Sequence, residues 1–263
     1  MPVPHHDAKH NGRPYLTPHR MLEYRAQIGH ETERPPRSII FGWQRGLAER
    51  IRSARPYREI AGPAGAMLEL TPLVGYALLP IGAPIAAIVL EELAPLGVET
   101  VIGLGTAGGI GTGLHAGEAV VCSAALRDEG TSHHYAPSAR WAHPDFDLLT
   151  ELRSALPHAI VGPTWTTDAP YRETIEEITL YRDGGVLTVE MEAAAMFTVG
   201  EALGVKTASV FCISDTLHGE AWEPSFHSTG LDNALWDLFE TVESVLVAHA
   251  APNRDASADG SLL

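Results

Sequence analysis

The sequence predicts an α/β protein with mainly parallel strands, because apolar runs of strand length alternate along the chain with helical segments. The clearest unit spans residues 187–213: residues 187–189 form a short apolar run, residues 193–203 are rich in good helix formers, and residues 207–213 form a second apolar run. Gly204 follows the helical segment and is expected to end it. Two strands joined by a helix in this way are expected to be parallel, with a right-handed crossover.

Further elements follow from the same patterns. Strands are expected at residues 38–41, 74–80, 99–102, 117–123 and 159–161, and helices at residues 47–53, 85–94, 145–156 and 232–249. Pro84 suits the first turn of its helix, where a missing N–H costs nothing. The last helix carries apolar residues at helical spacing, so one of its faces belongs to the core.

Three parts are expected along the chain. Residues 1–36 are polar and form an N-terminal arm, in which Thr17 can cap a short helix. Residues 37–250 form the α/β domain, without internal repeats or a linker. Residues 251–263 are expected to form a disordered tail.

Composition excludes several classes of protein. The 263 residues suffice for one large α/β domain or two small ones, and the hydrophobic content of 45% is normal for a globular core. No apolar run approaches the length of a membrane span, and residues 1–33 lack the apolar core of a signal peptide. The net charge of -15 argues against a nucleic-acid groove.

The cysteines and histidines point to no metal site. Cys122 and Cys212 are the only cysteines, and both lie in apolar strand-like runs, which favours buried reduced thiols and a cytoplasmic protein. The thirteen histidines show no spacing typical of metal ligands. We therefore expect neither a metal nor a cofactor.

A glycine-rich run follows the strand predicted at residues 99–102. Residues 103–108 contain Gly-x-Gly-x-x-Gly, the pattern of a dinucleotide-binding turn. That turn requires a helix to begin within the glycines, but Gly109, Gly111 and Gly113 continue the run, and each interior glycine costs a helix about 1 kcal/mol. The run therefore predicts a loop rather than a nicotinamide site.

Carboxylates follow both strands of the 187–213 unit. Glu190 and Glu192 flank Met191 after the first strand, and Asp215 comes two residues after the second. In parallel sheets ligands bind outside the carboxyl ends of the strands, so these side chains are expected to converge on one pocket. A single strand-end Asp is commonly a helix cap or a solvated loop residue. Two carboxylates in an apolar stretch are costly to desolvate, and a polyhydroxyl ligand would supply the donors that they need.

The order Val189-Glu-Met-Glu-Ala, a helix, and Ile213-Ser-Asp215 resembles the nucleoside phosphorylase and nucleosidase superfamily. This superfamily includes purine nucleoside and uridine phosphorylases and methylthioadenosine/adenosylhomocysteine nucleosidase. The resemblance covers roughly residues 38–249 and implies a single-domain three-layer α/β/α fold with a central mixed, largely parallel twisted sheet. It implies that Glu190, Met191 and Glu192 bind the ribose and that Asp215 is the catalytic acid towards a purine leaving group.

The resemblance also implies where phosphate or the attacking water lies. Gly105-Thr106-Ala107-Gly-Gly resembles the loop that backs it in the family. The family's second phosphate element is a Gly-Asp-Pro-x-Arg turn; here Gly42 fits, Asp-Pro is missing and Arg45 comes one residue early. Gly103 stands where many bacterial phosphorylases carry a phosphate-binding Arg. We therefore expect weak phosphate binding that depends on Arg45.

The resemblance also implies that residues 166–172 lie beside the base. They resemble the family pattern Ser/Thr-x-Asp-x-x-Tyr, which makes Asp168, Tyr171 and Arg172 base-side candidates. Asp215 favours a purine, because uridine phosphorylases tend to carry Asn there, but residues 127–135 resemble a loop of the uridine branch. The identity of the base stays open.

The expected activity is cleavage of the N-glycosidic bond of a nucleoside by phosphorolysis, giving free base and pentose 1-phosphate. Such an enzyme is a pentosyltransferase with phosphate as co-substrate. A phosphate-independent hydrolytic nucleosidase is the first alternative, and a non-catalytic nucleoside-binding protein of the same fold is the second. We expect a homo-oligomer, from dimer to hexamer, that binds neither nucleic acid nor membranes.

Overall fold

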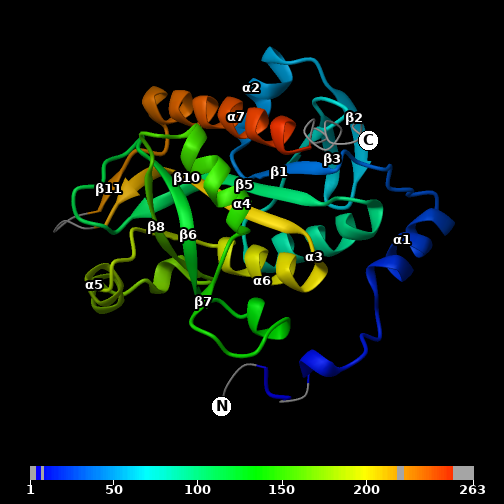
Figure 1. Ribbon diagram of the computed structural model, residues 1–263, viewed down its shortest axis with the longest axis horizontal. Coiled ribbons are helices and arrows are strands. Elements are labelled where there is room, and N and C mark those ends of the chain that lie inside the picture. The colour runs from blue at the N-terminus through cyan, green and yellow to red at the C-terminus, as the bar shows by residue number, and fades with distance from the viewer. Residues whose placement is uncertain (1–3, 7–8, 218–221, 251–263) are drawn as a thin grey trace, which may run out of the picture.

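The computed structural model describes residues 4–6, 9–217 and 222–250. It is a three-layer α/β/α structure in which helices cover both faces of one mixed sheet, as expected (Figure 1). The tail predicted at residues 251–263 lies outside the described residues. Within the described part, no helix is both long and apolar enough to cross a membrane.

The sheet contains eleven strands in the described part of the chain. They are β1 (Ser38–Gly42), β2 (Arg58–Gly62), β3 (Gly65–Glu69), β4 (Val74–Leu78), β5 (Thr100–Gly109), β6 (Ala119–Asp128), β7 (Trp141–Ala142), β8 (Ile160–Thr167), β9 (Thr188–Glu190), β10 (Lys206–Thr216) and β11 (Glu223–Pro224). The central strands β4, β1, β5 and β10 are neighbours in this order and pair in parallel. The outer strands β3 and β2 add an antiparallel extension beyond β4.

One half of the sheet closes into a ring. β5 pairs with β10, β10 with β6, β6 with β8, β8 with β9, and β9 returns to β5. Closing a sheet requires strong local bending, and the register shifts in β10 between Ile213 and Asp215 and in β6 between Cys122 and Ala125. The ring brings the ends of β5, β9 and β10 together.

The helices lie in two layers. They are α1 (Pro18–Gln27), α2 (Arg45–Ala54), α3 (Ala83–Leu93), α4 (Phe146–Ala155), α5 (Ile175–Asp183), α6 (Ala193–Leu203) and α7 (Thr229–Ala250). Short 3-10 helices are η1 (Lys9–Asn11), η2 (Ala94–Leu96), η3 (Ser132–His134) and η4 (Pro170–Arg172). Helices α3 and α6 cover one face of the sheet, and α2, α4 and α7 cover the other.

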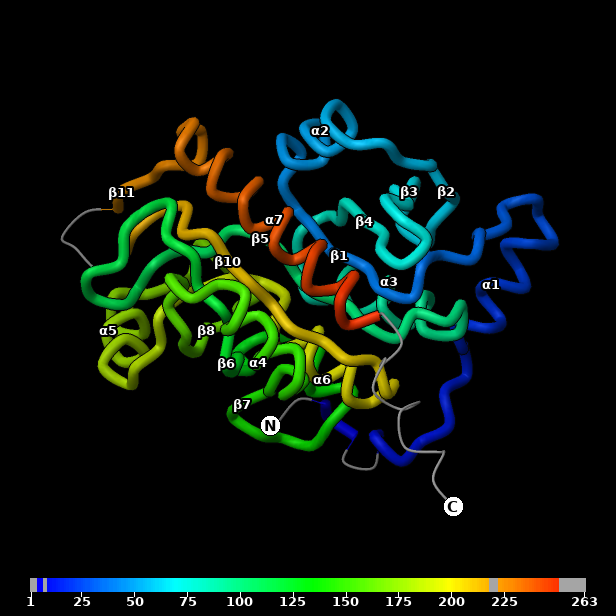
Figure 2. Tube along the Cα trace, turned by 45° about the horizontal axis from the view of Figure 1, so that its top comes forward, coloured from blue at the N-terminus to red at the C-terminus, as the bar shows by residue number. Residues whose placement is uncertain are grey.

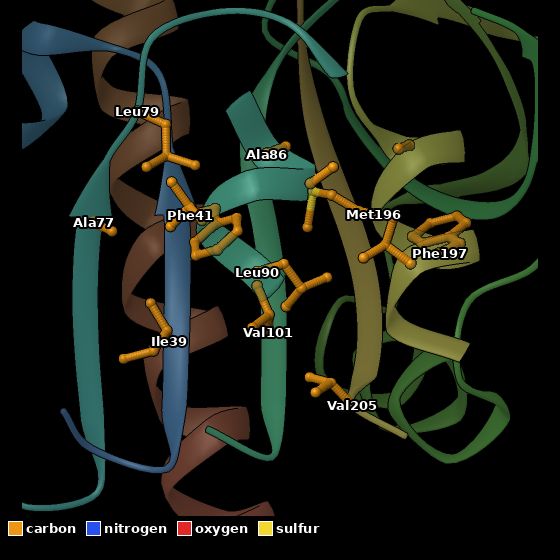
Figure 3. Packing of buried hydrophobic residues seen from close by; sticks show 14 of the residues in the cluster. Ile39, Phe41, Ala77, Leu79, Ala86, Leu90, Val101, Met196, Phe197 and Val205 are labelled. Carbon is orange, nitrogen blue, oxygen red and sulfur yellow. The ribbon is translucent and has the colours of Figure 1, made fainter. Parts of the chain in front are cut away.

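Side chains of β1 show how the sheet is buried on both sides. Ile39 and Phe41 pack into the cluster formed with α3 and α6, where Figure 3 shows Phe41 beside Leu90. Ile40 points the other way, into the cluster formed with α2 and α7. Successive residues of a strand alternate between faces, so an unbroken apolar run such as β1 marks a strand covered on both faces.

The N-terminal arm packs along the outside of the α3 layer (Figure 2). Thr17 caps α1 by accepting a hydrogen bond from the Arg20 amide, as the sequence predicts. No residue of α1 is buried, and Arg25 holds the helix to α3 through an ion pair with Glu92. This agrees with an arm that adds little to the core, and the division at residue 36 stays a proposal.

The prediction that residues 187–213 contain a parallel strand pair is wrong. Helix α6 and the cap at Gly204, which has φ 71°, are as expected. However, β9 pairs antiparallel with β5, whereas β10 pairs parallel with β5, and β9 and β10 do not pair with each other. The apolar runs do not reveal the ring, because its closure depends on pairings between segments far apart in the chain.

The glycine run at residues 103–109 is strand rather than the predicted loop. It continues β5 and pairs with β10 along its length. The glycines are required by close packing on both sides: a Cβ at Gly103 would lie 2.9 Å from Ser209 Oγ, and one at Gly108 would lie 2.6 Å from Leu217 Cδ1. An Arg side chain at position 103, which many bacterial phosphorylases carry at the matching place, would have no room in this structure.

Candidate active site

A cavity of about 660 Å³ opens where the ends of β5, β9 and β10 meet. The cause is the closed ring: Gly108 of β5 pairs with Val189 of β9 on one side and with Asp215 of β10 on the other. The carboxylates at the ends of β9 and β10 therefore converge, although the two strands are not a parallel pair. The cavity is lined by Trp43, Gln44, Ile81, Thr106, Ala107, Gly108, Pro170, Tyr171, Glu173, Val189, Glu190, Met191, Glu192, Ser214, Asp215, Leu217, Trp222 and Phe226.

Glu190 is held by the protein itself. Its Oε2 accepts hydrogen bonds from the backbone amides of Glu192 (2.8 Å) and Ala193 (2.7 Å), and its Oε1 accepts one from the Thr166 hydroxyl. These contacts satisfy amides at the start of α6, which otherwise lack partners. Burial nevertheless raises the pKa of Glu190. Its oxygens are occupied, so its principal effect is to fix the turn that carries Met191 and Glu192.

Glu192 has acceptor capacity left over. It is buried, the Gly82 amide donates to its Oε1 at 2.6 Å, and the Met191 amide is a second backbone donor to the carboxylate. Burial and the neighbouring Glu190 raise the pKa of Glu192. A carboxylate can accept about four hydrogen bonds, so a buried one that has two backbone donors at the cavity wall suits a ligand that brings its own donors, such as a vicinal diol.

Asp215 lies on the opposite wall. The Ser214 hydroxyl donates to its Oδ1 at 2.7 Å, and the Trp222 indole N–H donates to its Oδ2 at 2.8 Å. The strand β11 pairs with Asp215 and Thr216 and so holds the segment of Trp222 and Phe226 over this end of the cavity. Residues 222–227 therefore lie over Asp215, while residues 218–221 lie outside the described residues.

Glu173 is a cavity residue that sequence reasoning missed. It follows η4 and has no hydrogen bond from its carboxyl group to any described residue. Burial, together with the nearby charges of Asp215 and Glu177, raises the pKa of Glu173 to about 7. A carboxyl group that lines a cavity and has a pKa close to neutral pH is a candidate functional group. The signal in the sequence was weak, because Glu173 stands beside the Thr174 cap of α5 and resembles an ordinary helix-start acid.

The third part of the cavity is formed by the turn after β1 and by β5. The Gln44 Nε2 donates to the Thr106 hydroxyl oxygen at 3.1 Å. The Trp43 ring lies against the backbone at Gly105, where an added Cβ would be 3.1 Å from the ring. Trp43 Nε1 and Gln44 Oε1 are both buried and have no hydrogen-bond partner among the described residues.

The electrostatic character of the cavity is acidic. Four carboxyl groups line it, those of Glu173, Glu190, Glu192 and Asp215, and none of the described lining residues is Lys, Arg or His. The raised pKa of Glu173, Glu190 and Glu192 lowers the charge that these groups carry near neutral pH. Among the described residues, no cluster of His, Cys, Asp and Glu is arranged to hold a metal ion.

The predicted site residues divide into two groups. The cavity brings together Thr106, Ala107, Tyr171, Glu190, Met191, Glu192 and Asp215. Outside its lining are Gly42, Arg45, Gly105, Asp168 and Arg172. Arg45 is exposed at the start of α2, and Asp168 accepts a hydrogen bond from the Gly130 amide.

Arg127, which begins the segment that resembles the uridine branch, lies outside this cavity. It lines a separate cavity beside α6, and its guanidinium donates to Ser132 Oγ (2.9 Å) and to the Pro137 carbonyl (2.8 Å). These hydrogen bonds stabilise the loop after β6, so the Arg127 side chain has a structural role.

Fold and cavity together define a class: an α/β protein whose closed half-sheet presents several carboxylates to one cavity. The chain belongs to the phosphorylase superfamily, whose family model matches residues 55–245. This match includes β5, β9 and β10 and thus most of the cavity.

Individual relatives agree with this membership. The chain is 37% identical over 141 residues to a guanosine phosphorylase of Halorubrum lacusprofundi, a match of 52% of this chain and 58% of that protein. It is 34% identical over 191 residues to a uridine phosphorylase of Treponema pallidum, covering 65% of this chain and 72% of the relative. The first match thus spans less than two thirds of the relative. A uridine phosphorylase structure from Vibrio fischeri superimposes with a TM-score of 0.71 at 23% identity, covering 81% of this chain and 93% of that one, and shares the fold.

Proposed function

We propose that this protein cleaves the N-glycosidic bond of a nucleoside by phosphorolysis and releases the free base and a pentose 1-phosphate. The observation that carries the proposal is the meeting of Glu192 and Asp215 across one cavity. Glu192 offers acceptors for two sugar hydroxyls, and Asp215 stands where a base would leave. Phosphate is the co-substrate and no cofactor takes part.

The reaction balances without any other reactant. A phosphate oxygen forms a bond to the anomeric carbon, the C–N bond breaks, and its electron pair stays on the base nitrogen. The proton that the dihydrogen phosphate loses appears on the released base. The sugar passes through an oxocarbenium-like state. Asp215 relays a proton to the base, while Glu192 and Met191 hold the sugar.

Three further features belong to the proposal. Glu190 positions the turn that carries Glu192, through its bonds to the amides at the start of α6. Tyr171, Trp222 and Phe226 cover the base. We also propose a homo-oligomeric state, on the basis of the family. A cytoplasmic location is proposed because both cysteines are buried and free.

A panel of purine and pyrimidine nucleosides, incubated with and without phosphate, tests the proposal. Base release is followed by ultraviolet absorbance. We expect release from at least one nucleoside that rises with phosphate concentration and saturates. Failure to cleave any nucleoside, with tight nucleoside binding, would instead indicate a binding protein.

A hydrolytic nucleosidase is the second candidate, favoured by one observation. Cations and charge-assisted donors are the strongest partners of a phosphate dianion, and the described cavity lining has none. Water needs no such partner. Base release at the same rate with and without phosphate would identify this reaction.

Glu173 leads to a prediction about the base. Its carboxylate has free acceptors, so it favours a base edge that carries N–H donors, such as the ring N–H and amino group of guanine. The ring nitrogen of adenine at that edge is an acceptor and is repelled. The ratio of kcat/KM for guanosine to that for adenosine should therefore rise as the pH increases through about 7, where Glu173 ionises. Glu173→Gln should remove this rise, and an unchanged pH profile in the variant would contradict the assignment.

A further inference from the structure

The contact between Gln44 and Thr106 has a consequence for the attacking nucleophile. A Thr hydroxyl can donate one hydrogen bond and accept others. Because Gln44 Nε2 occupies an acceptor position of Thr106 Oγ1 at 3.1 Å, the hydroxyl proton of Thr106 remains available to another acceptor. Thr106 is half-buried and lines the cavity, so that acceptor can be a ligand atom.

Gln44 has no other evident task. It is the N-cap residue of α2, but its side chain makes no capping hydrogen bond to the helix amides. The side chain instead crosses from the turn after β1 to β5, and its Oε1 is buried with no partner in the described part of the chain. An unpartnered buried acceptor is unfavourable, and it is tolerated here while the other atom of the amide contacts Thr106.

We propose that Gln44 is a positioning residue that orients the Thr106 hydroxyl as a donor to the attacking oxygen of phosphate. The inference rests on the proposed phosphorolysis. In this proposal the uncharged Gln44 amide supports phosphate binding through Thr106, a role that the sequence analysis gave to Arg45. Arg45 is exposed and lies outside the cavity lining, so its charge acts only through solvent.

The described cavity wall offers phosphate only uncharged hydrogen-bond donors. With four carboxyl groups in the wall and no described cation, an ordinary phosphate site is absent. Neutral donors bind a phosphate monoanion more weakly than a guanidinium would. The enzyme should therefore need high phosphate concentrations, and loss of one oriented donor should weaken phosphate use by roughly tenfold.

The test compares Gln44→Ala, Gln44→Glu, Thr106→Val and the matched neighbour Arg45→Ala. The KM for phosphate and the KM for the nucleoside are measured for each variant. We expect Gln44→Ala to raise the phosphate KM about tenfold, to leave the nucleoside KM unchanged, and Arg45→Ala to match wild type. Gln44→Glu should be worse than Gln44→Ala, because a carboxylate accepts the Thr106 proton and repels phosphate. A purely structural role for Gln44 would not produce this order.

A double-mutant cycle completes the test. Gln44→Ala should have no further effect on the phosphate KM in a Thr106→Val background, because both changes remove one interaction. Additive effects, a normal phosphate KM in Gln44→Ala, or base release independent of phosphate would each overturn the inference.

Calorimetric titration with inorganic phosphate separates this inference from the proposed function. If no nucleoside is cleaved but wild type binds phosphate more tightly than Gln44→Ala, the activity assignment fails and the role of Gln44 in binding phosphate stands. If wild type binds no phosphate, or if both proteins bind it equally, the role of Gln44 is contradicted.

Discussion

Glu192→Gln is expected to lose most of kcat/KM for nucleosides, by a factor on the order of 10² to 10³. A hydrogen bond to a charged group contributes about 1.5–3 kcal/mol, and the ribose diol offers two such bonds to the carboxylate. In the variant, Gln Oε1 can keep the contact with the Gly82 amide, but its Nε2 cannot accept from a hydroxyl. Steady-state kinetics at fixed phosphate measure the loss.

The fold should survive this change, because the Gln side chain has the same shape and keeps one acceptor for Gly82. Glu118→Gln is the matched control: Glu118 also accepts a hydrogen bond from a backbone amide, that of His115, but lies outside the cavity. It should leave kcat/KM unchanged. Near-normal activity of a correctly folded Glu192→Gln protein would rule out the ribose assignment.

Asp215→Asn is expected to slow natural purine nucleosides by about 10² to 10⁴, the range of general acid catalysis. A nucleoside whose base leaves without protonation should be spared. Measuring both substrate types in the variant and in wild type gives the comparison. Equal losses on both would show that Asp215 holds the structure rather than moving a proton.

The contact with Trp222 needs its own control, since Asn places an N–H group opposite the indole N–H and so breaks that bond as well. Trp222→Phe removes the indole donor but keeps the Asp215 carboxyl. We expect Trp222→Phe to retain the dependence on leaving group that Asp215→Asn loses. The two variants thus distinguish proton transfer by Asp215 from the contribution of the Trp222 ring that covers the base.

The sequence predicts most of the helices and the central strands because their signals are local, but it misses α5 and the strands β2 and β3. Helix α6 and its Gly204 cap follow from helix formers and a left-handed glycine, and the apolar run at β1 predicts a strand covered on both faces. The convergence of Glu192 and Asp215 was also expected, but for the wrong reason. It arises from the closed ring and not from a parallel strand pair.

The nucleophile end of the site could not be read from the sequence. The family resemblance pointed to Arg45 although its spacing is one residue short, yet α2 begins at Arg45 and directs it to solvent. Gln44, one residue earlier, reaches β5 instead. Glu173 was missed for a similar reason: its place in the cavity wall, near the charge of Asp215, depends on the path of the chain after β8.

The central claim is that phosphate displaces the base from the sugar in the cavity between β5, β9 and β10. Identification of the sugar product by ³¹P nuclear magnetic resonance tests it most directly. Pentose 1-phosphate should appear in the same amount as free base with wild type, and neither product should accumulate at a comparable rate with Glu192→Gln. Free pentose in place of the phosphate ester, with base released at the same rate, would contradict the claim.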